Sequence, residues 1–233
     1  VANATLGGTI TGTGALIMSA TALAYGSTTA GQTRLLTLTG TSPSSVVNEF
    51  APVIANNSTN LTRLIKSGSN TWAITGLNTY TGATAVNAGT VLALGANTLP
   101  SNTALTVAGG ALLDLNDFSQ TAGSLAGAGA VDLGSGILTV GGNNTSTLFS
   151  GILSGTGGLT KSGAGTLVLS QPNNYSGPTT LNAGESIVVV KNLTKFRSRY
   201  GNAPVVAGTY TVTIRDAYDR VIFRAAATRQ CRQ

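Results

Sequence analysis

The sequence predicts an all-β fold, a β-solenoid of stacked parallel coils, from its composition, its short strands and an internal repeat. Of the 233 residues, 31 are Gly, 36 are Thr and 18 are Asn, whereas only 9% are charged and 5% are aromatic. β-Branched residues favour strands, and Gly and Asn favour tight turns. Strands of ~4–6 residues that alternate with Gly or Asn corners, without helical stretches between them, predict a chain that coils on itself.

The predicted elements follow in chain order. Residues 1–30, with the apolar run Leu16-Ile17-Met18, are interpreted as an N-terminal apolar coil or assembly strand. Residues 31–190 are the predicted β-helix, and residues 191–233 are a basic C-terminal cap or assembly module. The strands expected in the β-helix are Trp72–Thr75, Thr84–Asn87, Thr90–Leu94, Ala104–Val107, Ala111–Leu115, Ala130–Leu133, Ile137–Val140, Thr166–Ser170, Thr179–Asn182 and Ser186–Val190.

An internal repeat organises the β-helix. A shift of 95 residues aligns Lys66–Leu94 with Lys161–Val189 without a gap, and 11 of the 29 positions are identical. The two recognisable repeats span 64–94 and 159–189. The residues that we expect to shape the corners and strands of the repeat are Gly68, Asn78, Tyr80, Gly82, Asn87, Gly89, Gly163, Asn173, Tyr175, Gly177, Asn182 and Gly184.

The second repeat, Leu159 to Gly184, has the pattern L-x-K-S-G-x-G-T-L-x-L-S-x-x-N-x-Y-x-G-x-T-x-x-N-A-G. This pattern resembles the autotransporter-associated β-strand repeat, the passenger-associated transport repeat of bacterial type V secreted proteins. The first copy departs from it at Ser69-Asn70 and Trp72. The resemblance covers roughly residues 30–190 and implies a right-handed parallel β-helix, secreted or on the cell surface, that is not an enzyme and carries no catalytic positions.

Charge is distributed unevenly along the chain. Residues 1–190 contain four Lys+Arg and five Asp+Glu, a net −1, and residues 191–233 contain nine and two, a net +7. In the basic segment, Thr209–Arg215 and Arg220–Arg224 predict a β-hairpin that caps the last coil or pairs with a neighbouring subunit. The candidate assembly contacts are Leu16, Ile17, Arg197, Arg199, Tyr210, Val212, Ile214, Arg220, Val221, Phe223 and Arg224.

Several residues could carry chemistry, and for each we favour a structural interpretation. Asp114, Asp117 and Asp132 could form an acid–base groove for polysaccharide cleavage or a Ca²⁺ site, but solvated turn aspartates are expected. Lys66 and Lys161 are expected to be exposed at strand starts. Tyr80 and Tyr175 are expected to pack over corner glycines rather than to stack on sugars, and Cys231 could be a free thiol or form an intermolecular disulfide. Irregular Thr spacing argues against ice binding.

These observations predict a non-enzymatic extracellular bacterial structural protein, a rigid β-solenoid that self-assembles head to tail into a surface fibre or filament. The alternative is a monomeric autotransporter-type passenger or adhesin that binds host or matrix glycans, and a polysaccharide-degrading enzyme ranks third. We expect no cofactor, no metal, no nucleic-acid partner and no membrane span in this chain, because His is absent, charge is scarce and apolar runs are short.

Overall fold

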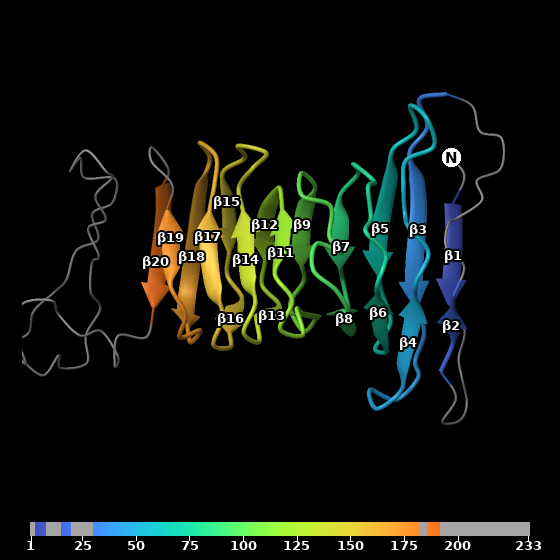
Figure 1. Ribbon diagram of the computed structural model, residues 1–233, viewed down its shortest axis with the longest axis horizontal. Helices are drawn as coiled ribbons and strands as arrows, with labels where there is room; N and C mark the ends of the chain where they lie inside the picture. Colours follow the sequence, from blue (N-terminus) through green and yellow to red (C-terminus); the bar gives the residue numbers. More distant parts are fainter. Residues whose placement is uncertain (1–2, 8–14, 20–29, 182–185, 192–233) are drawn as a thin grey trace, which may run out of the picture.

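The computed structural model describes residues 3–7, 15–19, 30–181 and 186–191. Strands stack side by side into a rod, with the strands across its long axis (Figure 1). Every pairing between named strands is parallel. The described part is therefore a parallel β-solenoid, as the sequence predicts; the predicted C-terminal cap lies outside the described residues.

Three sheets form the sides of the rod. The first sheet contains, in spatial order, β1 (Asn3–Gly7), β3 (Arg34–Thr39), β5 (Thr62–Lys66), β7 (Thr84–Val86), β9 (Ala104–Val107), β12 (Ser124–Gly127), β15 (Thr147–Phe149), β18 (Thr166–Asn173) and β20 (Ser186–Lys191). The second contains β16 (Ile152–Ser154), β13 (Ala130–Asp132), β10 (Leu112–Asp114), β8 (Thr90–Ala93), β6 (Thr71–Ile74), β4 (Val47–Phe50) and β2 (Ile17–Met18). The third contains β11 (Gln120–Ala122), β14 (Ile137–Val140), β17 (Gly158–Lys161) and β19 (Thr179–Leu181).

The strand register gives the length of each coil. Lys66 pairs with Val86, Val86 with Val107, Val107 with Gly127 and Gly127 with Phe149, so these coils contain 20 to 22 residues. At the N-terminal end the coils are longer, because Leu38 pairs with Lys66 at a separation of 28 residues. With ~4.8 Å between neighbouring strands, the nine strands of the first sheet span ~38 Å.

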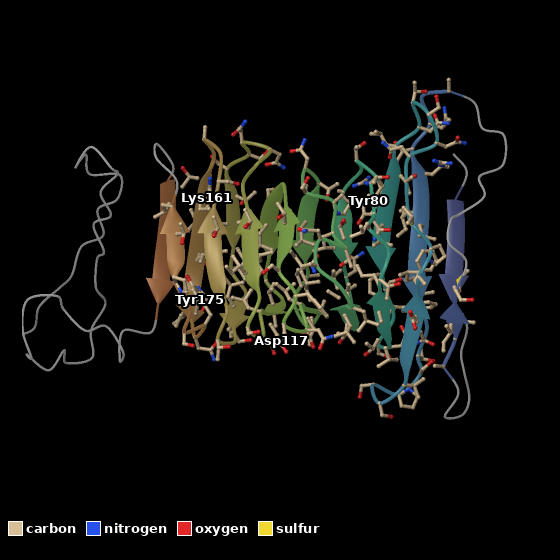
Figure 2. All side chains as sticks on the ribbon, viewed as in Figure 1. Tyr80, Asp117, Lys161 and Tyr175 are labelled. Carbon is tan, nitrogen blue, oxygen red and sulfur yellow. The ribbon has the colours of Figure 1, made fainter. Side chains whose placement is uncertain are left out.

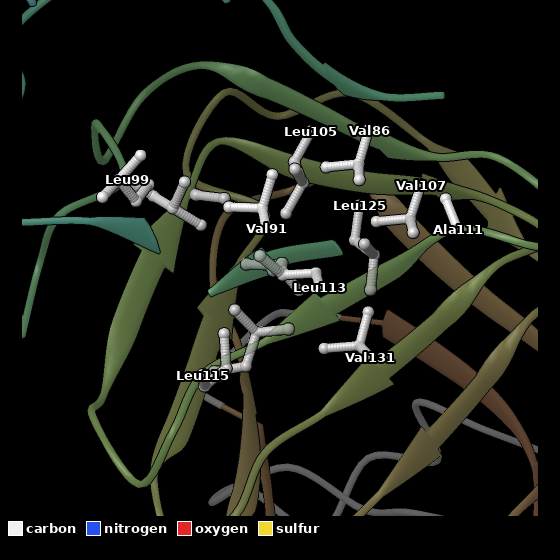
Figure 3. Close-up of a cluster of buried hydrophobic side chains, with 14 of the residues drawn as sticks. Val86, Val91, Leu99, Leu105, Val107, Ala111, Leu113, Leu115, Leu125 and Val131 are labelled. Carbon is white, nitrogen blue, oxygen red and sulfur yellow. The ribbon is translucent and has the colours of Figure 1, made fainter. Parts of the chain in front are cut away.

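The interior of the rod is a continuous aliphatic stack. Alternate residues of each strand point inward, as the buried and partly exposed positions of β3 show. Val86, Leu105, Leu113 and Val131 from successive coils meet in this core (Figure 3). Burial of apolar area at ~25 cal/mol per Å² stabilises the stack, and a coil can bury its inner face only against its neighbours.

Predicted and observed strands agree closely inside the repeats. Ala104–Val107 and Ile137–Val140 match β9 and β14 residue for residue, while β18 extends beyond the predicted Ser170 to Asn173. Its pairing with β20 shifts between Leu169 and Asn173, which is a bulge as the chain turns the corner. In the part of the chain that the structure describes, no helix has the length and hydropathy needed to cross a membrane.

Candidate functional site

The two repeats occupy different sides of the rod. Lys66 ends β5 in the first sheet, whereas the equivalent Lys161 ends β17 in the third sheet. Four coils carry the chain from Lys66 to Phe149, and 12 further residues reach Lys161. The second copy therefore begins one side earlier in the coil than the first. Tyr80 and Tyr175 accordingly lie toward opposite margins of the rod (Figure 2). The repeat thus encodes a corner and its flanking strands, and it can occupy any side.

The expectation that Lys66 and Lys161 are exposed at strand starts is wrong. Their side chains are 0% and 1% exposed, and both residues end their strands. Lys66 stands in the inward-facing column that Leu38, Val86 and Val107 otherwise fill with aliphatic side chains. Strand alternation directs the side chain into the rod, where it meets backbone carbonyls that turn inward at the corner.

Each lysine ammonium is held by backbone carbonyls, an arrangement that we call the ammonium cage. The Lys66 Nζ donates to the carbonyl oxygens of Ser67 at 2.9 Å, Gly68 at 2.7 Å and Ala88 at 3.0 Å, so it joins two successive coils. The Lys161 Nζ donates to Ser162 at 2.6 Å and Gly163 at 2.7 Å. Burial lowers the pKa of the Lys66 ammonium to about 8, because the charged form loses its hydration.

The repeat glycines lie where two coils touch. A Cβ built on each would lie 2.2–2.4 Å from a backbone oxygen of a neighbouring coil, which is far inside van der Waals contact, at Gly68, Gly82, Gly89, Gly163 and Gly177. The glycine pattern in the repeat therefore reflects close approach between coils. Asn87, the repeat residue before Ala88, is exposed, and its backbone N–H donates to the Lys66 carbonyl.

The repeat asparagines hydrogen-bond neighbouring coils. The Asn78 Oδ1 accepts from the Ile54 N–H at 2.7 Å, and the Asn78 Nδ2 donates to the Thr98 carbonyl at 2.8 Å. One buried amide thereby bridges the coils on both sides of it. In the second copy the Asn173 Oδ1 accepts from the Leu153 N–H at 2.7 Å. These bonds satisfy backbone groups where regular strand pairing is interrupted.

The repeat tyrosines are core residues. Tyr80 and Tyr175 are 1% and 2% exposed, and their hydroxyls hydrogen-bond those of Thr84 and Thr179. Burial raises the pKa of both phenols. Their rings therefore present no face to a sugar. Among the aromatic residues with described side chains, Phe118 alone is exposed, at 39%.

The three aspartates lie together on the outside of the second sheet. Asp114 and Asp132 are register partners on β10 and β13, and Asp117 lies in the turn after β10 at the margin of the rod (Figure 2). Their Oδ1 atoms accept from the N–H groups of Asn116, Gly134 and Ser135, respectively. Burial raises the pKa of Asp114, and the neighbouring carboxylates of Asp132 and Asp117 raise it further, whereas the bond from Asn116 lowers it. Each aspartate thus braces a turn, and the described residues contain no group of three acidic, His or Cys side chains arranged to hold a metal.

Threonine spacing is regular on one side of the rod, contrary to the sequence-based expectation. Thr121, Thr139, Thr160 and Thr180 pair in register across the third sheet and form one outward-facing column. The adjacent outward positions include Ile137 and Gly158, so these described strands carry a single file of hydroxyls rather than a flat array.

Among the candidate assembly contacts, only Leu16 and Ile17 fall in the described part of the chain. They are 38% and 61% exposed, at and beside β2, which is the last strand of the second sheet. The basic segment, including the predicted hairpin and Cys231, and the repeat residues Asn182 and Gly184 lie outside the described residues. Their roles stay predictions.

Comparison with known proteins agrees with the fold and the repeat. A family model for the passenger-associated transport repeat matches residues 64–93 and 159–185. The chain is 38% identical over 128 residues to an adhesin, the BmaC autotransporter of Brucella suis biovar 1 (strain 1330). The similarity covers 52% of this chain and 4% of that protein, so the chain spans a small part of its length. No solved structure matches.

Proposed function

Because the chain carries two passenger-associated transport repeats, we propose that it is a rod-like passenger segment of a bacterial surface adhesin. The observation that carries the proposal is the unbroken parallel stack of nine strands in the first sheet. Such a stack gains ~4.8 Å of length with each coil and loses no backbone pairing as it grows. It is suited to hold adhesive surfaces away from the cell, and the similarity to an autotransporter adhesin supports that setting.

The proposed ligands are host or matrix glycans, and the structure changes which residues are candidates for binding them. Tyr80 and Tyr175 are buried, so a glycan cannot stack on them. Phe118, exposed beside Asp117, is the aromatic platform that the described residues offer. Stacking of a sugar on an aromatic face would give the rod a lateral binding site rather than one at its tip.

The experiment is a glycan-array measurement on the purified chain and on its Phe118→Ala variant. We expect binding to one glycan class that Phe118→Ala weakens about tenfold or more, with Tyr80→Phe as the matched control that keeps the ring buried. Binding that both variants retain would refute the assignment to Phe118. Absence of binding by the wild-type chain would leave the rod as a stalk, which small-angle scattering tests: a compact rather than rod-like particle would refute the stalk as well.

End-to-end self-assembly is the second candidate. Each of the terminal strands of the first sheet, β1 and β20, pairs with one neighbour among the described residues. An unpaired strand edge can accept another coil, either of a longer chain or of a second copy. Negative-stain microscopy tests this proposal, because filaments would support it and isolated rods at high protein concentration would refute it.

A further inference from the structure

Exposed charge is segregated between the sides of the rod. All four carboxylates of the described residues lie on the outer surface of the second sheet or in the turn that follows β10; they are Glu49, Asp114, Asp117 and Asp132. The register places Glu49, Ala73, Leu92, Asp114 and Asp132 in one outward-facing column, which together with Asp117 we call the acidic face.

The basic residues of the rod do not balance this charge locally. Lys66 and Lys161 are enclosed in their ammonium cages and Arg34 is 6% exposed, so none of them neutralises the surface. Arg63 is the one exposed base among the described side chains, and it belongs to β5 in the first sheet. The acidic face therefore carries an unbalanced negative charge that the sequence, which places four bases in this part of the chain, conceals.

The basic segment begins close to this face. Lys191, the last described residue, pairs with Asn173. Asn173 and Asn174 in turn hydrogen-bond the backbone of Leu153 in β16, at 2.7 and 3.0 Å, and β16 is the neighbour of β13 in the second sheet. The chain thus leaves the described part on the side of the second sheet, about two strand spacings, ~10 Å, beyond Asp132.

We propose that residues 192–233 dock along the acidic face of their own chain. The segment carries eight Lys+Arg against two Asp, a net +6, and its 42 residues reach much farther than the ~38 Å rod, because an extended chain spans ~3.3 Å per residue. Arg220 and Arg224 flank the apolar run Val221-Ile222-Phe223, and this order of charged and apolar residues fits the face.

The composition of the face matches such an occupant. Beside the acidic column runs an outward column that contains Leu112, Ala130 and Ile152, and Ile152 is 48% exposed. Guanidinium groups bind carboxylates through paired hydrogen bonds, and a cation between Asp114 and Asp132 relieves the repulsion of the two adjacent carboxylates. Single exposed ion pairs are weak, but tethering supplies a high effective concentration of the segment. The inference does not depend on the proposed adhesive function.

Carboxyl footprinting of the full chain tests this docking directly, because it reports on the carboxylates whichever arginine covers them. The chain is treated with a carbodiimide and glycine ethyl ester, and mass spectrometry gives the labelling rate of Asp114, Asp117 and Asp132. The comparison is with a variant that has Gln at the five arginines Arg197, Arg199, Arg215, Arg220 and Arg224. Arg63→Gln is the matched control, because it removes an exposed positive charge from the first sheet. Trp72 fluorescence confirms that each variant is folded.

We expect the wild-type aspartates to be labelled about tenfold more slowly than those of the five-arginine variant at low salt. The difference should disappear near 1 M salt, where the Debye length is ~3 Å. Arg63→Gln should behave as the wild type. Equal labelling of the wild type and the five-arginine variant would overturn the proposal. Protection that grows with protein concentration would also overturn it, because the occupant would then be a second copy.

Discussion

Replacement of Gly89 by alanine tests the tight corner above the Lys66 ammonium cage. Gly89 has φ of +64°, and a Cβ there would lie 2.4 Å from the Asn70 carbonyl oxygen, 2.5 Å from that of Gly68 and 2.7 Å from the Lys66 Nζ. The left-handed conformation costs alanine roughly 1–2 kcal/mol. Forcing an extra carbon into a packed interior costs roughly 1–3 kcal/mol more. We therefore expect Gly89→Ala to lower the free energy of unfolding by about 2–5 kcal/mol.

The chain offers a matched control at the corner of the next coil. Gly110 has φ of +82°, but a Cβ on it would meet no heavy atom within 4 Å. Gly110→Ala should therefore show only the backbone cost of roughly 1–2 kcal/mol. The difference between the two variants isolates the packing of one carbon against the cage.

Urea unfolding followed by the fluorescence of Trp72 measures both variants. Trp72 is the single tryptophan of the chain, is 1% exposed and lies in β6, which follows the Lys66 corner. Far-UV circular dichroism gives a second, global signal. If Gly89→Ala and Gly110→Ala shift the midpoint equally, the corner is not packed as described and the reasoning from coil contact fails.

Three further predictions concern the titratable groups. The pKa of Lys66 is about 8 in the folded chain and its ordinary value is 10.5, so between these pH values only the unfolded chain holds the proton. The unfolding free energy should therefore rise with pH over that range, by at most ~1.4 kcal/mol per pH unit, and Lys66→Met should abolish the rise; parallel urea-derived curves for the two proteins would contradict this. Asp114→Asn keeps the acceptor for the Asn116 N–H but removes a carboxylate whose pKa is raised, so it should stabilise the fold at neutral pH by up to ~1 kcal/mol, and the gain should vanish in acid, where Asp114 is protonated; a loss of stability at neutral pH would refute it. Amine acetylation read by mass spectrometry should modify Lys66 and Lys161 about tenfold more slowly in the native chain than in denaturant, because burial of both lysines blocks the reagent; equal rates would show that the cages open readily.

Much of the architecture can be predicted from local chemistry. Short strands, glycine corners and the 95-residue repeat suffice to predict parallel stacking, because each feature depends on residues close together in the chain. β9 and β14 match their predicted ranges for this reason. Even the burial of Lys66 has a local signal, since it follows the inward-facing Leu64 by two residues and so shares its side of the strand.

The sequence alone determined the fold class, the repeat and the separation of a nearly neutral rod from a basic segment. Only the tertiary structure decided which side of the rod each repeat occupies, because that depends on summed coil lengths of 20 to 22 residues, which no local pattern specifies. It also decided the fate of the lysines. A strongly hydrated ammonium is expected at the surface, and it is stable inside here because Ala88, 22 residues farther along the chain, completes its ring of carbonyl oxygens. With these positive charges buried, the exposed charge of the rod is set by which side its carboxylates share, and stacking alone brings them together.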